Sequence, residues 1–320
     1  MLTTLKQALS KACFGKGCAS VRTLLLSLAL FANTPSSVCP AQNALVLQSD
    51  FGVSDGAVAA MKGVAFSVDR KLQIFDLTHD VPPFNIWEAS LRLWQTAPYW
   101  PPGTVFVSVV DPGVGTDRKS VVLKTKSGHY FVTPDNGTLT HVAEHMGVEA
   151  IREIDEAVNR RRDSEKSYTF HGRDVYAYTG ARLASGVIDF SEVGGLLEPH
   201  VVSIPYTKAT YENGVVSGGI PILDVRYGNV WTNIPRDIFR KLGVKNGEMC
   251  EVKVLRGNDL IYVEKLPFCK TFGEVGVGKP LLYLNSIDQV AIAINQGNFA
   301  ESFGVSSGPG WEIRIQKESK

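Results

Sequence analysis

Residues 104–113 read TVFVSVVDPG, an apolar and mostly β-branched run that ends in an acid, a proline and a glycine. Such a run is typical of a buried strand, and the Pro-Gly pair indicates a turn where the run ends. Residues 44–47 and 72–77 have the same character, and the stretches 57–68 and 85–96 between the strands have helical periodicity. This alternation predicts an α/β domain with a mostly parallel sheet flanked by helices.

The periodicity changes at about residue 200. Before it, a hairpin is expected over 121–133, and further helices over 138–146 and 175–185. After it, strand-length runs alternate with Gly and Asn turns, at 214–225, 230–234, 249–255, 260–262, 281–284 and 290–294. We therefore expect an α/β domain over 44–198, a linker over 199–211 and an all-β domain over 212–317. A small closed barrel is the expected form of the second domain, with a β-sandwich as the alternative.

The composition is that of a globular protein and not of a nucleic-acid binder. The chain has 320 residues, 44% of them hydrophobic and 20% charged, which suits about two domains. Lys and Arg total 33 against 32 Asp and Glu, a net charge of +1. No basic field is available to bind a phosphate backbone, which disfavours a nucleic-acid partner. No apolar run approaches the ~18 residues that a membrane-spanning helix needs.

Residues 1–41 have the order of a secretory signal peptide. They contain four basic residues and no acid, and an apolar stretch over 23–32 is followed by a Pro- and Ser-rich segment ending at Ala41. This order predicts export to the periplasm or the outside of the cell. The alternative is a start codon assigned too far upstream of a cytoplasmic protein.

Removal of this segment would change both charge and cysteine content. It leaves 29 Lys and Arg against 32 Asp and Glu, a net charge of −3. It also removes three cysteines and leaves Cys250 and Cys269. These two could form a disulfide in an exported protein, or remain buried thiols in the cytosol.

Acids stand at or near the ends of the predicted parallel strands: Asp50, Asp76, Asp80 and Asp111. Ligands of open α/β sheets bind just outside the carboxyl ends of the strands. An Asp there can accept both hydroxyls of a ribose or position a water molecule. The alternative is that each of these acids only caps a turn or helix.

Two further clusters could bring catalytic groups to the same place. In DPGVGTDR (111–118), the tight loop can bring Arg118 to Asp111 and hold its carboxylate ionised, although a purely structural ion pair is the alternative. In TFHGRD (169–174), His171 is a candidate acid, base or water-orienting group; alone it would be an ordinary hydrogen-bonded histidine.

A different cluster, DVRYGNVW (224–231), lies in the all-β part. Its acid suits an ammonium group, its Asn suits the edge of a purine, and its aromatic residues can stack on the base. The alternative is a hairpin with cross-strand aromatic packing. The stretch HVAEH (141–145) fits an inverted zinc-protease pattern, but no third ligand is obvious and we expect no metal there.

Taken together and in order, these motifs resemble the SAM hydrolase (adenosine-forming) family, the SAM hydroxide adenosyltransferases, whose superfamily includes fluorinases and chlorinases. The matching stretches extend from about residue 44 to 315: SDFGVSDGAVAAMKG, DLTHDVPPFNI, VSVVDPGVGTDR, TPDNGTL, TFHGRD, ILDVRYGNVWTNI and LLYLNS. The resemblance implies an α/β domain followed by a β-barrel, and a homotrimer. S-adenosyl-L-methionine (SAM) would lie between the N-terminal domain of one subunit and the C-terminal domain of the next, as substrate, with no cofactor.

The resemblance also implies a role for individual residues. It implies a water-activating triad of Asp111, Arg118 and His171. The remaining implied positions bind the substrate: Asp50 the ribose hydroxyls, Phe84 the ribose and sulfonium, Asp224 the ammonium, Ser286 the carboxylate, Asn229 the adenine edge, and Tyr227 and Phe272 the adenine face.

Three departures from the halogenase pattern favour water over halide. Halogenases have Tyr in place of Asp111, the fluorinase has a halide-binding Ser in place of Gly172, and the fluorinase loop insertion expected between residues 118 and 130 is absent. A fourth departure is Ile287, where the fluorinase has Arg next to the matching Ser. We expect hydrolysis of SAM to adenosine and L-methionine by attack of an activated water at C5′. The alternatives are a SAM- or adenosine-binding protein without turnover, and a SAM-dependent halogenase.

Overall fold

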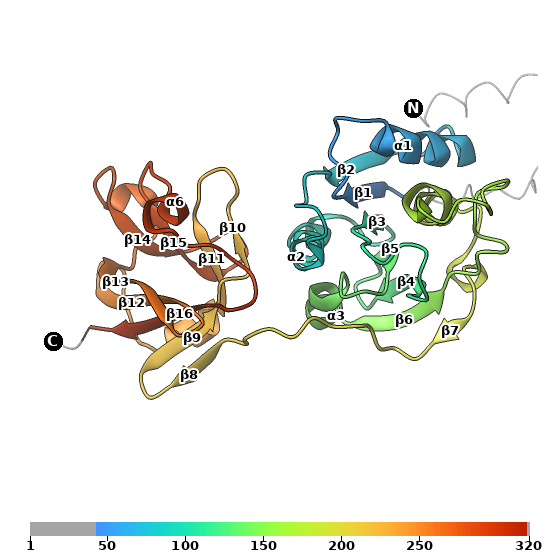
Figure 1. The fold of residues 1–320 in the computed structure, drawn as a ribbon. Coiled ribbons are helices and arrows are strands. Elements are labelled where there is room, and N and C mark those ends of the chain that lie inside the picture. Colours follow the sequence, from blue (N-terminus) through green and yellow to red (C-terminus); the bar gives the residue numbers. More distant parts are fainter. Residues whose placement is uncertain (1–42, 319–320) are drawn as a thin grey trace, which may run out of the picture. The chain divides into compact units, whose positions relative to one another are not determined.

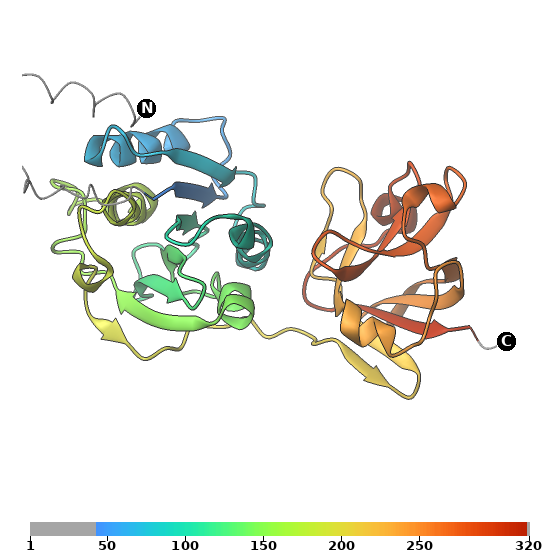
Figure 2. The ribbon, with the colours of Figure 1, turned by 180° about the vertical axis from the view of Figure 1, so that it is seen from behind.

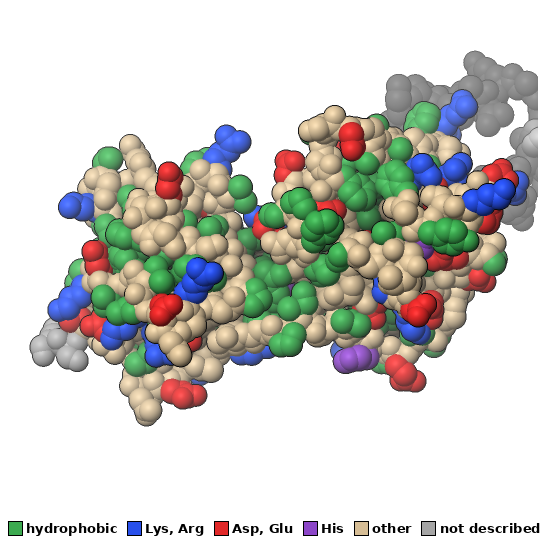
Figure 3. Space-filling view, in the orientation of Figure 1, with side chains coloured by type: hydrophobic (Ala, Val, Ile, Leu, Met, Phe, Trp, Pro, Cys, Tyr) green, Lys and Arg blue, Asp and Glu red, His purple; other side chains and the backbone are tan. Residues whose placement is uncertain are grey.

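The computed structural model describes residues 43–318, whose strands form three sheets (Figure 1). The predicted signal peptide, with Ala41 and the first three cysteines, lies outside the described residues. Within residues 43–318, no helix is long and apolar enough to cross a membrane. Acidic and basic side chains are interspersed over the face seen in Figure 3, in keeping with the near-neutral composition.

The first sheet has seven strands in the order β2-β1-β3-β5-β4-β6-β7. The pairs β1/β2, β1/β3 and β3/β5 are parallel, whereas β5/β4, β4/β6 and β6/β7 are antiparallel. The expectation of a mostly parallel sheet therefore holds for one half, and the whole sheet is mixed. The tight turn between β4 and β5 imposes the change of direction, since a short hairpin can join only antiparallel strands. The bounds of these strands are β1 Leu45–Ser49, β2 Ile74–Thr78, β3 Val105–Val109, β4 Ser120–Thr125, β5 Tyr130–Pro134, β6 Val148–Glu153 and β7 Leu196–Leu197.

Helices cover both faces of this sheet (Figure 2). Helices α1 (Ala57–Val68) and α4 (Tyr178–Ala184) contribute to one apolar core, and α2 (Ile86–Thr96) and α3 (Thr140–Met146) to the other. Strands β1 and β3 are buried along their whole length because they lie between the two cores. Their ends are consequently fixed positions from which loops can present side chains.

The helix predicted over 175–185 begins earlier than its periodicity indicates. A π-helical turn, η2 (Gly172–Ala177), follows His171 directly and continues into α4. Turns of this kind carry an extra residue and are frequent at functional sites. Short 3₁₀ turns lie at η1 (Ala97–Tyr99), η3 (Phe190–Glu192) and η4 (Phe272–Glu274).

The remaining strands confirm an all-β C-terminal region, but not a closed barrel. They form two antiparallel sheets, of order β10-β11-β15-β14 and β13-β12-β16-β9-β8, and both contribute side chains to one core. This is the arrangement of a sandwich, in which two sheets share a core without a continuous ladder around it. The elements are β8 Thr210–Glu212, β9 Val215–Gly219, β10 Ile222–Leu223, β11 Val230–Pro235, α5 Arg236–Arg240, β12 Met249–Arg256, β13 Asp259–Pro267, β14 Pro280–Leu284, β15 Gln289–Ile294, α6 Phe299–Phe303 and β16 Trp311–Lys317.

The two cysteines of this region are buried free thiols, Cys250 on β12 and Cys269 just after β13. Of the two alternatives left open by the sequence, the structure therefore has thiols and no disulfide between these residues. Burial raises the pKa of Cys250 to about 12, so its thiol stays protonated at neutral pH.

Helix α4 lies so close to the sheet that a side chain at Gly180 would clash with it. A Cβ atom at this position would lie 2.4 Å from Val107 Cγ2 and 3.3 Å from Leu45 Cδ1, and both partners are fully buried. We predict that Gly180→Ala lowers the free energy of unfolding by about 1–3 kcal/mol, because overpacking strains the core.

The matched control is Gly63→Ala on α1, where the added Cβ meets nothing within 4 Å. There the change should stabilise by about 0.5–1 kcal/mol through helix propensity alone. Urea unfolding of the two variants measures both values, and equal effects would contradict the close contact at Gly180.

Candidate functional site

A cavity of about 240 Å³ lies at the carboxyl ends of β1 and β3 and before η2. Four of the predicted site residues line it: Asp50, Phe84, Asp111 and His171. Two of the strand-end acids, Asp50 and Asp111, thus lie at this cavity. The other two do not line it: Asp76 lies within β2 and pairs with Lys62 at 2.6 Å, and Asp80 follows that strand.

Arg118 joins Asp111 to His171. Its Nε lies 2.9 Å from Asp111 Oδ1 and its Nη2 lies 2.6 Å from Oδ2, a bidentate pair, while Nη2 is also 3.0 Å from His171 Nδ1. The side chains of Asp111 and Arg118 are only 4% and 11% exposed. Burial alone would lower the pKa of Arg118, but its hydrogen bonds to Asp111 raise that pKa above its ordinary value. The predicted triad is therefore a contiguous cluster.

The contact with Arg118 fixes the state of His171 in this arrangement. A guanidinium can only donate, so Nδ1 accepts and the proton of the neutral ring is on Nε2. His171 Nε2 is buried and has no hydrogen-bond partner among the described residues. Burial lowers the pKa of His171, and the nearby guanidinium groups of Arg118 and Arg160 lower it further. The imidazole is thus neutral at pH 7 and has one unused nitrogen.

Tyr176 is a member of this cluster that the sequence analysis missed. Its hydroxyl lies 3.4 Å from Asp111 Oδ2 and 3.2 Å from Ser120 Oγ, and the guanidinium of Arg118 lies 5.7 Å from the centre of its ring. Burial raises the pKa of Tyr176, which keeps the hydroxyl protonated and able to donate to the carboxylate. The helical pattern after TFHGRD could have placed Tyr176 near His171, because both lie at the start of one helix.

Asp50 holds the loop that carries Phe84. Its Oδ2 accepts a hydrogen bond from the backbone N–H of Phe84 at 2.9 Å. Phe84 has φ of +64°, a left-handed conformation that is unusual for a bulky residue, and the residue is 71% exposed. The backbone at Phe84 is thus strained, and this conformation presents an aromatic ring beside the cavity.

A second cavity, of about 780 Å³, lies in the C-terminal sheets. Five more of the predicted site residues line it: Asp224, Tyr227, Asn229, Phe272 and Ser286. Asn229 Nδ2 lies 3.3 Å from Asp224 Oδ2, and the rings of Phe272 and Tyr283 are 4.9 Å apart. Aromatic walls with one amide and one carboxylate suit a flat base and a cationic group.

Asn285 is a further lining residue that the sequence analysis did not single out. Its Oδ1 accepts from the backbone N–H groups of Ile287 and Gln289, whereas its Nδ2 is buried without a partner in the described chain. The Nδ2 amide group is therefore free to donate hydrogen bonds beside Ser286. The next residue along the chain, Ile287, is apolar and supplies no cation there.

The two cavities are separate within residues 43–318. No hydrogen bond, ion pair or ring contact links the predicted residues of one to those of the other over this part of the chain. Each set is thus a partial site.

The HVAEH stretch on α3 is occupied by other contacts. His141 Nδ1 lies 3.0 Å from Ser90 Oγ, Glu144 accepts from Tyr206 and Lys208, and His145 stacks on Trp94 with centroids 4.3 Å apart. Residues 43–318 contain no group of three or more His, Cys, Asp or Glu that could hold a metal ion.

Comparison with known proteins identifies both parts of the chain. Residues 45–194 match the SAM hydroxide adenosyltransferase N-terminal domain, and residues 218–312 match the corresponding C-terminal domain. Curated relatives named (R)-S-adenosyl-L-methionine hydrolase come from Methanocaldococcus jannaschii (37% identity over 72% of this chain and 80% of that protein) and Salinispora tropica (34%, over 83% and 95%). A fluorinase from Actinoplanes sp. is 30% identical over 82% of this chain and 95% of its own.

A solved structure has the same fold. The crystal structure of an uncharacterized conserved protein from Thermotoga maritima aligns with a TM-score of 0.79 and 38% identity, over 85% of this chain and 100% of that one.

The buried ion pair predicts a large effect on stability. Arg118→Met would leave the Asp111 carboxylate buried without its cation, and we expect a loss of about 3–5 kcal/mol in the free energy of unfolding. Lys119→Met removes the neighbouring cation, whose partner Glu153 is exposed, and should cost under about 1 kcal/mol. Adding Asp111→Asn to Arg118→Met should restore part of the loss. Denaturant titration of the four proteins measures this, and a small effect of Arg118→Met would contradict the pairing.

Proposed function

The chain belongs to the SAM hydroxide adenosyltransferase family, and from this we propose that it hydrolyses S-adenosyl-L-methionine to adenosine and L-methionine. The observation that carries the proposal is the cluster of Asp111, Arg118 and His171 at one cavity. Relatives at 34–37% identity that are named (R)-S-adenosyl-L-methionine hydrolase support it.

The chemistry explains what this cluster must supply. A water oxygen forms a bond to C5′ while the C5′–S bond breaks, and its electron pair passes to sulfur, which becomes a neutral thioether. The sulfonium is already a good leaving group, so the protein needs chiefly to place a weak nucleophile in line behind C5′. One water proton stays on the new 5′-hydroxyl, and the other passes to a base.

Asp111 and His171 are placed to hold that water. The carboxylate of Asp111 is oriented by its hydrogen bonds from Arg118, and the hydroxyl of Tyr176 occupies a further position on Oδ2. This leaves Oδ1 the freer oxygen, with one contact to Arg118 Nε. The unused Nε2 of His171 supplies the second contact, and the water proton leaves to this pair.

The substrate-binding groups divide between the two cavities. We propose that Asp50 accepts the ribose hydroxyls and that Phe84 covers the ribose and sulfonium. In the second cavity, Asn229 would bind the adenine edge between Tyr227 and Phe272, with Asp224 on the ammonium and Ser286 on the carboxylate. Because neither cavity holds all of these groups, we propose a homotrimer in which copies of the chain complete each other's sites. The C-terminal sheets of one copy would then supply the second half of each site.

The packing around Gly172 favours water over halide. A Cβ atom there would lie 2.9 Å from Val109 Cγ1 and 3.4 Å from Phe51 Cε2. A serine, the residue that the fluorinase has at this position, would therefore need Val109 to move. Fluoride turnover is accordingly expected to be absent.

Export remains our proposal for the location of the protein. The basis is the order of basic, apolar and small residues over 1–41. N-terminal sequencing of the native protein would test it, and a chain that begins at Met1 in the cytoplasm would overturn it.

We predict that the purified protein converts SAM to equal amounts of adenosine and L-methionine, and that Asp111→Ala abolishes this conversion while SAM binding survives. Chromatography measures the products and calorimetry measures the binding. Asp117→Ala, an exposed acid of the same loop, is the control and should keep full activity.

The outcomes separate the alternatives. Bound but intact SAM would favour a binding protein, and a 5′-halogenated adenosine in the presence of halide would favour a halogenase. Full activity of Asp111→Ala would remove this carboxylate from the mechanism.

We further predict that two inactive variants complement each other. Asp111→Ala disables the first cavity and Asp224→Ala the second, so a mixed assembly contains some sites built from two intact halves. After unfolding and refolding a 1:1 mixture, random trimers should regain about a quarter of wild-type activity. Refolded single variants are the controls, and no recovery in a mixture that refolds to trimers would contradict a shared site.

A further inference from the structure

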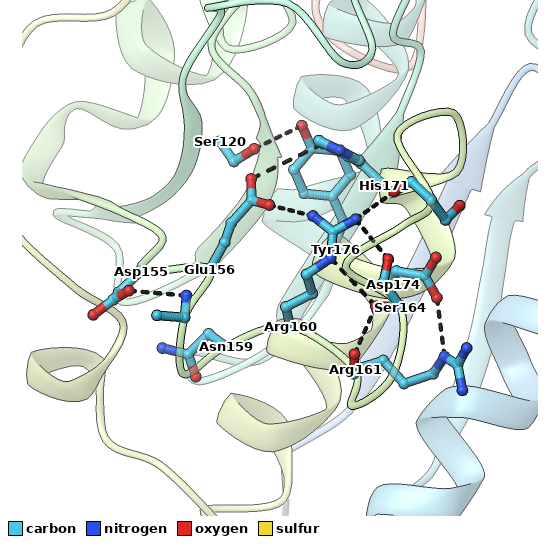
Figure 4. A network of polar contacts seen from close by, with 12 residues as sticks. Ser120, Asp155, Glu156, Asn159, Arg160, Arg161, Ser164, His171, Asp174 and Tyr176 are labelled. Atoms are coloured by element: carbon cyan, nitrogen blue, oxygen red, sulfur yellow. Dashed lines mark hydrogen bonds and ion pairs between the residues drawn. The ribbon is translucent and has the colours of Figure 1, made fainter.

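The loop between β6 and η2 brings a second carboxylate to His171. Glu156 Oε1 lies 4.0 Å from His171 Nδ1 (Figure 4). Arg118 contacts the same ring nitrogen at 3.0 Å. The side chain of Glu156 is 35% exposed and that of His171 is 7% exposed. The sequence analysis did not single out Glu156. Its loop contains many charged residues, and no motif distinguishes this acid from the others.

Glu156 is fixed in this position by Arg160. Nη1 of Arg160 lies 2.5 Å from Glu156 Oε2, and the guanidinium also donates to Ser164 Oγ at 3.2 Å and to the backbone carbonyl of Ser167. Arg160 is thus tied to the loop at several points and holds one carboxylate oxygen. The other oxygen, Oε1, is left facing the imidazole.

Nδ1 of His171 therefore has two competing partners. When Arg118 donates to it, the ring proton is on Nε2 and the imidazole cannot accept a proton there. When Nδ1 carries the proton and donates it to Glu156, Nε2 has a free lone pair toward the cavity. The exchange requires the ring to move about 1 Å from Arg118 toward Glu156, the difference between the present separation and a hydrogen bond.

Asp111 is the weaker candidate for the water proton. Its Oδ2 accepts from Nη2 and Nε of Arg118, at 2.6 and 3.0 Å, and from Tyr176. Protonation would break this arrangement, whereas Nε2 of His171 has no partner to lose.

We propose that Glu156 is a positioning residue of the hydrolysis, which accepts a hydrogen bond from Nδ1–H of His171 so that Nε2 takes the proton from the attacking water. This inference rests on the proposed function. The balance is complete: the O–C5′ bond forms, the C5′–S pair goes to methionine, and the released proton yields an imidazolium flanked by the Glu156 carboxylate. Release of that proton to solvent restores the neutral ring.

The charged and titratable groups around His171 determine the pH dependence. Asp111 and Arg118 face it from the loop after β3, Glu156 and Arg160 from the loop after β6, and Tyr176 from η2. The negative charge of Glu156 raises the pKa of His171 against the effects of burial and of the two guanidinium groups. Removal of this charge must lower that pKa further.

The test is Glu156→Gln, measured as the pH profile of SAM hydrolysis. We expect kcat to fall about 10- to 100-fold with little change in KM, because a proton acceptor is impaired and binding is not. The acidic limb of the profile should move to lower pH, which a merely structural defect would not cause. Glu156→Asp keeps the charge and should retain the wild-type position of the limb with part of the rate.

Two further proteins complete the test. Glu165→Gln, an exposed acid of the same loop, is the matched control and should behave as wild type. In a His171→Gln background, Glu156→Gln should have no additional effect, since Glu156 acts through the imidazole.

Unchanged kcat and an unmoved limb in Glu156→Gln, with active wild type, would overturn the inference and leave the hydrolase assignment intact. Absence of adenosine from the wild type would instead overturn the proposed function. If Glu156→Gln does not fold, Glu156→Asp decides: a reduced kcat with the limb at its wild-type position supports the role, and full wild-type kinetics contradicts it.

Discussion

The guanidinium of Arg118 is the interaction on which the site depends. It binds Asp111 through two nitrogens and His171 through one of the same two, and it lies over the ring of Tyr176. A planar group with several fixed donors can serve partners from two distant stretches of chain at once, which a lysine could not do. Its charge also balances a carboxylate that is almost entirely buried. Removal of this one group would leave three side chains without a common partner.

The sheet order explains why these stretches meet. Strand β3 lies beside β1 and β5, so the ends of β1 and β3 are adjacent and carry Asp50 and Asp111 to one cavity. The hairpin partner β4 begins at Ser120, two residues after Arg118. The loop that leaves β3 at Asp111 therefore folds back, and the guanidinium at its end binds the carboxylate at its beginning. The helix that begins with η2 then brings His171 to the same end of the sheet.

The sequence predicted those parts of the site that depend on local pattern. Strands end visibly at Asp50 and Asp111, and the Gly-rich loop to Arg118 is short enough to close on itself. The same pattern could not decide whether Asp76 and Asp80 reach the site, because it does not reveal that β2 is an edge strand whose Asp76 pairs with Lys62 on α1. Glu156 and Tyr176 were missed since their positions follow from the long loop after β6 and from the π-helical turn. The closed barrel was not confirmed, and the sequence could not decide it because hydrophobic alternation is the same in a barrel and in two stacked sheets.

The π-helical turn η2 has a consequence for how the site and the core are related. An extra residue in a helix offsets everything before it by about 100° relative to everything after it. In this chain, His171 and Tyr176 lie at or within that turn, whereas Gly180 on α4 packs against Val107 and Leu45 of the sheet. Because of this offset, the side chains of the first turn and those of α4 can point in independent directions from one continuous helix. The polar groups of the turn therefore face Arg118 while the apolar side of α4 still packs against the core. Shortening the turn by one residue would force a choice between them, and a family of such proteins could exchange chemistry at this end of the helix while its packing end stays the same.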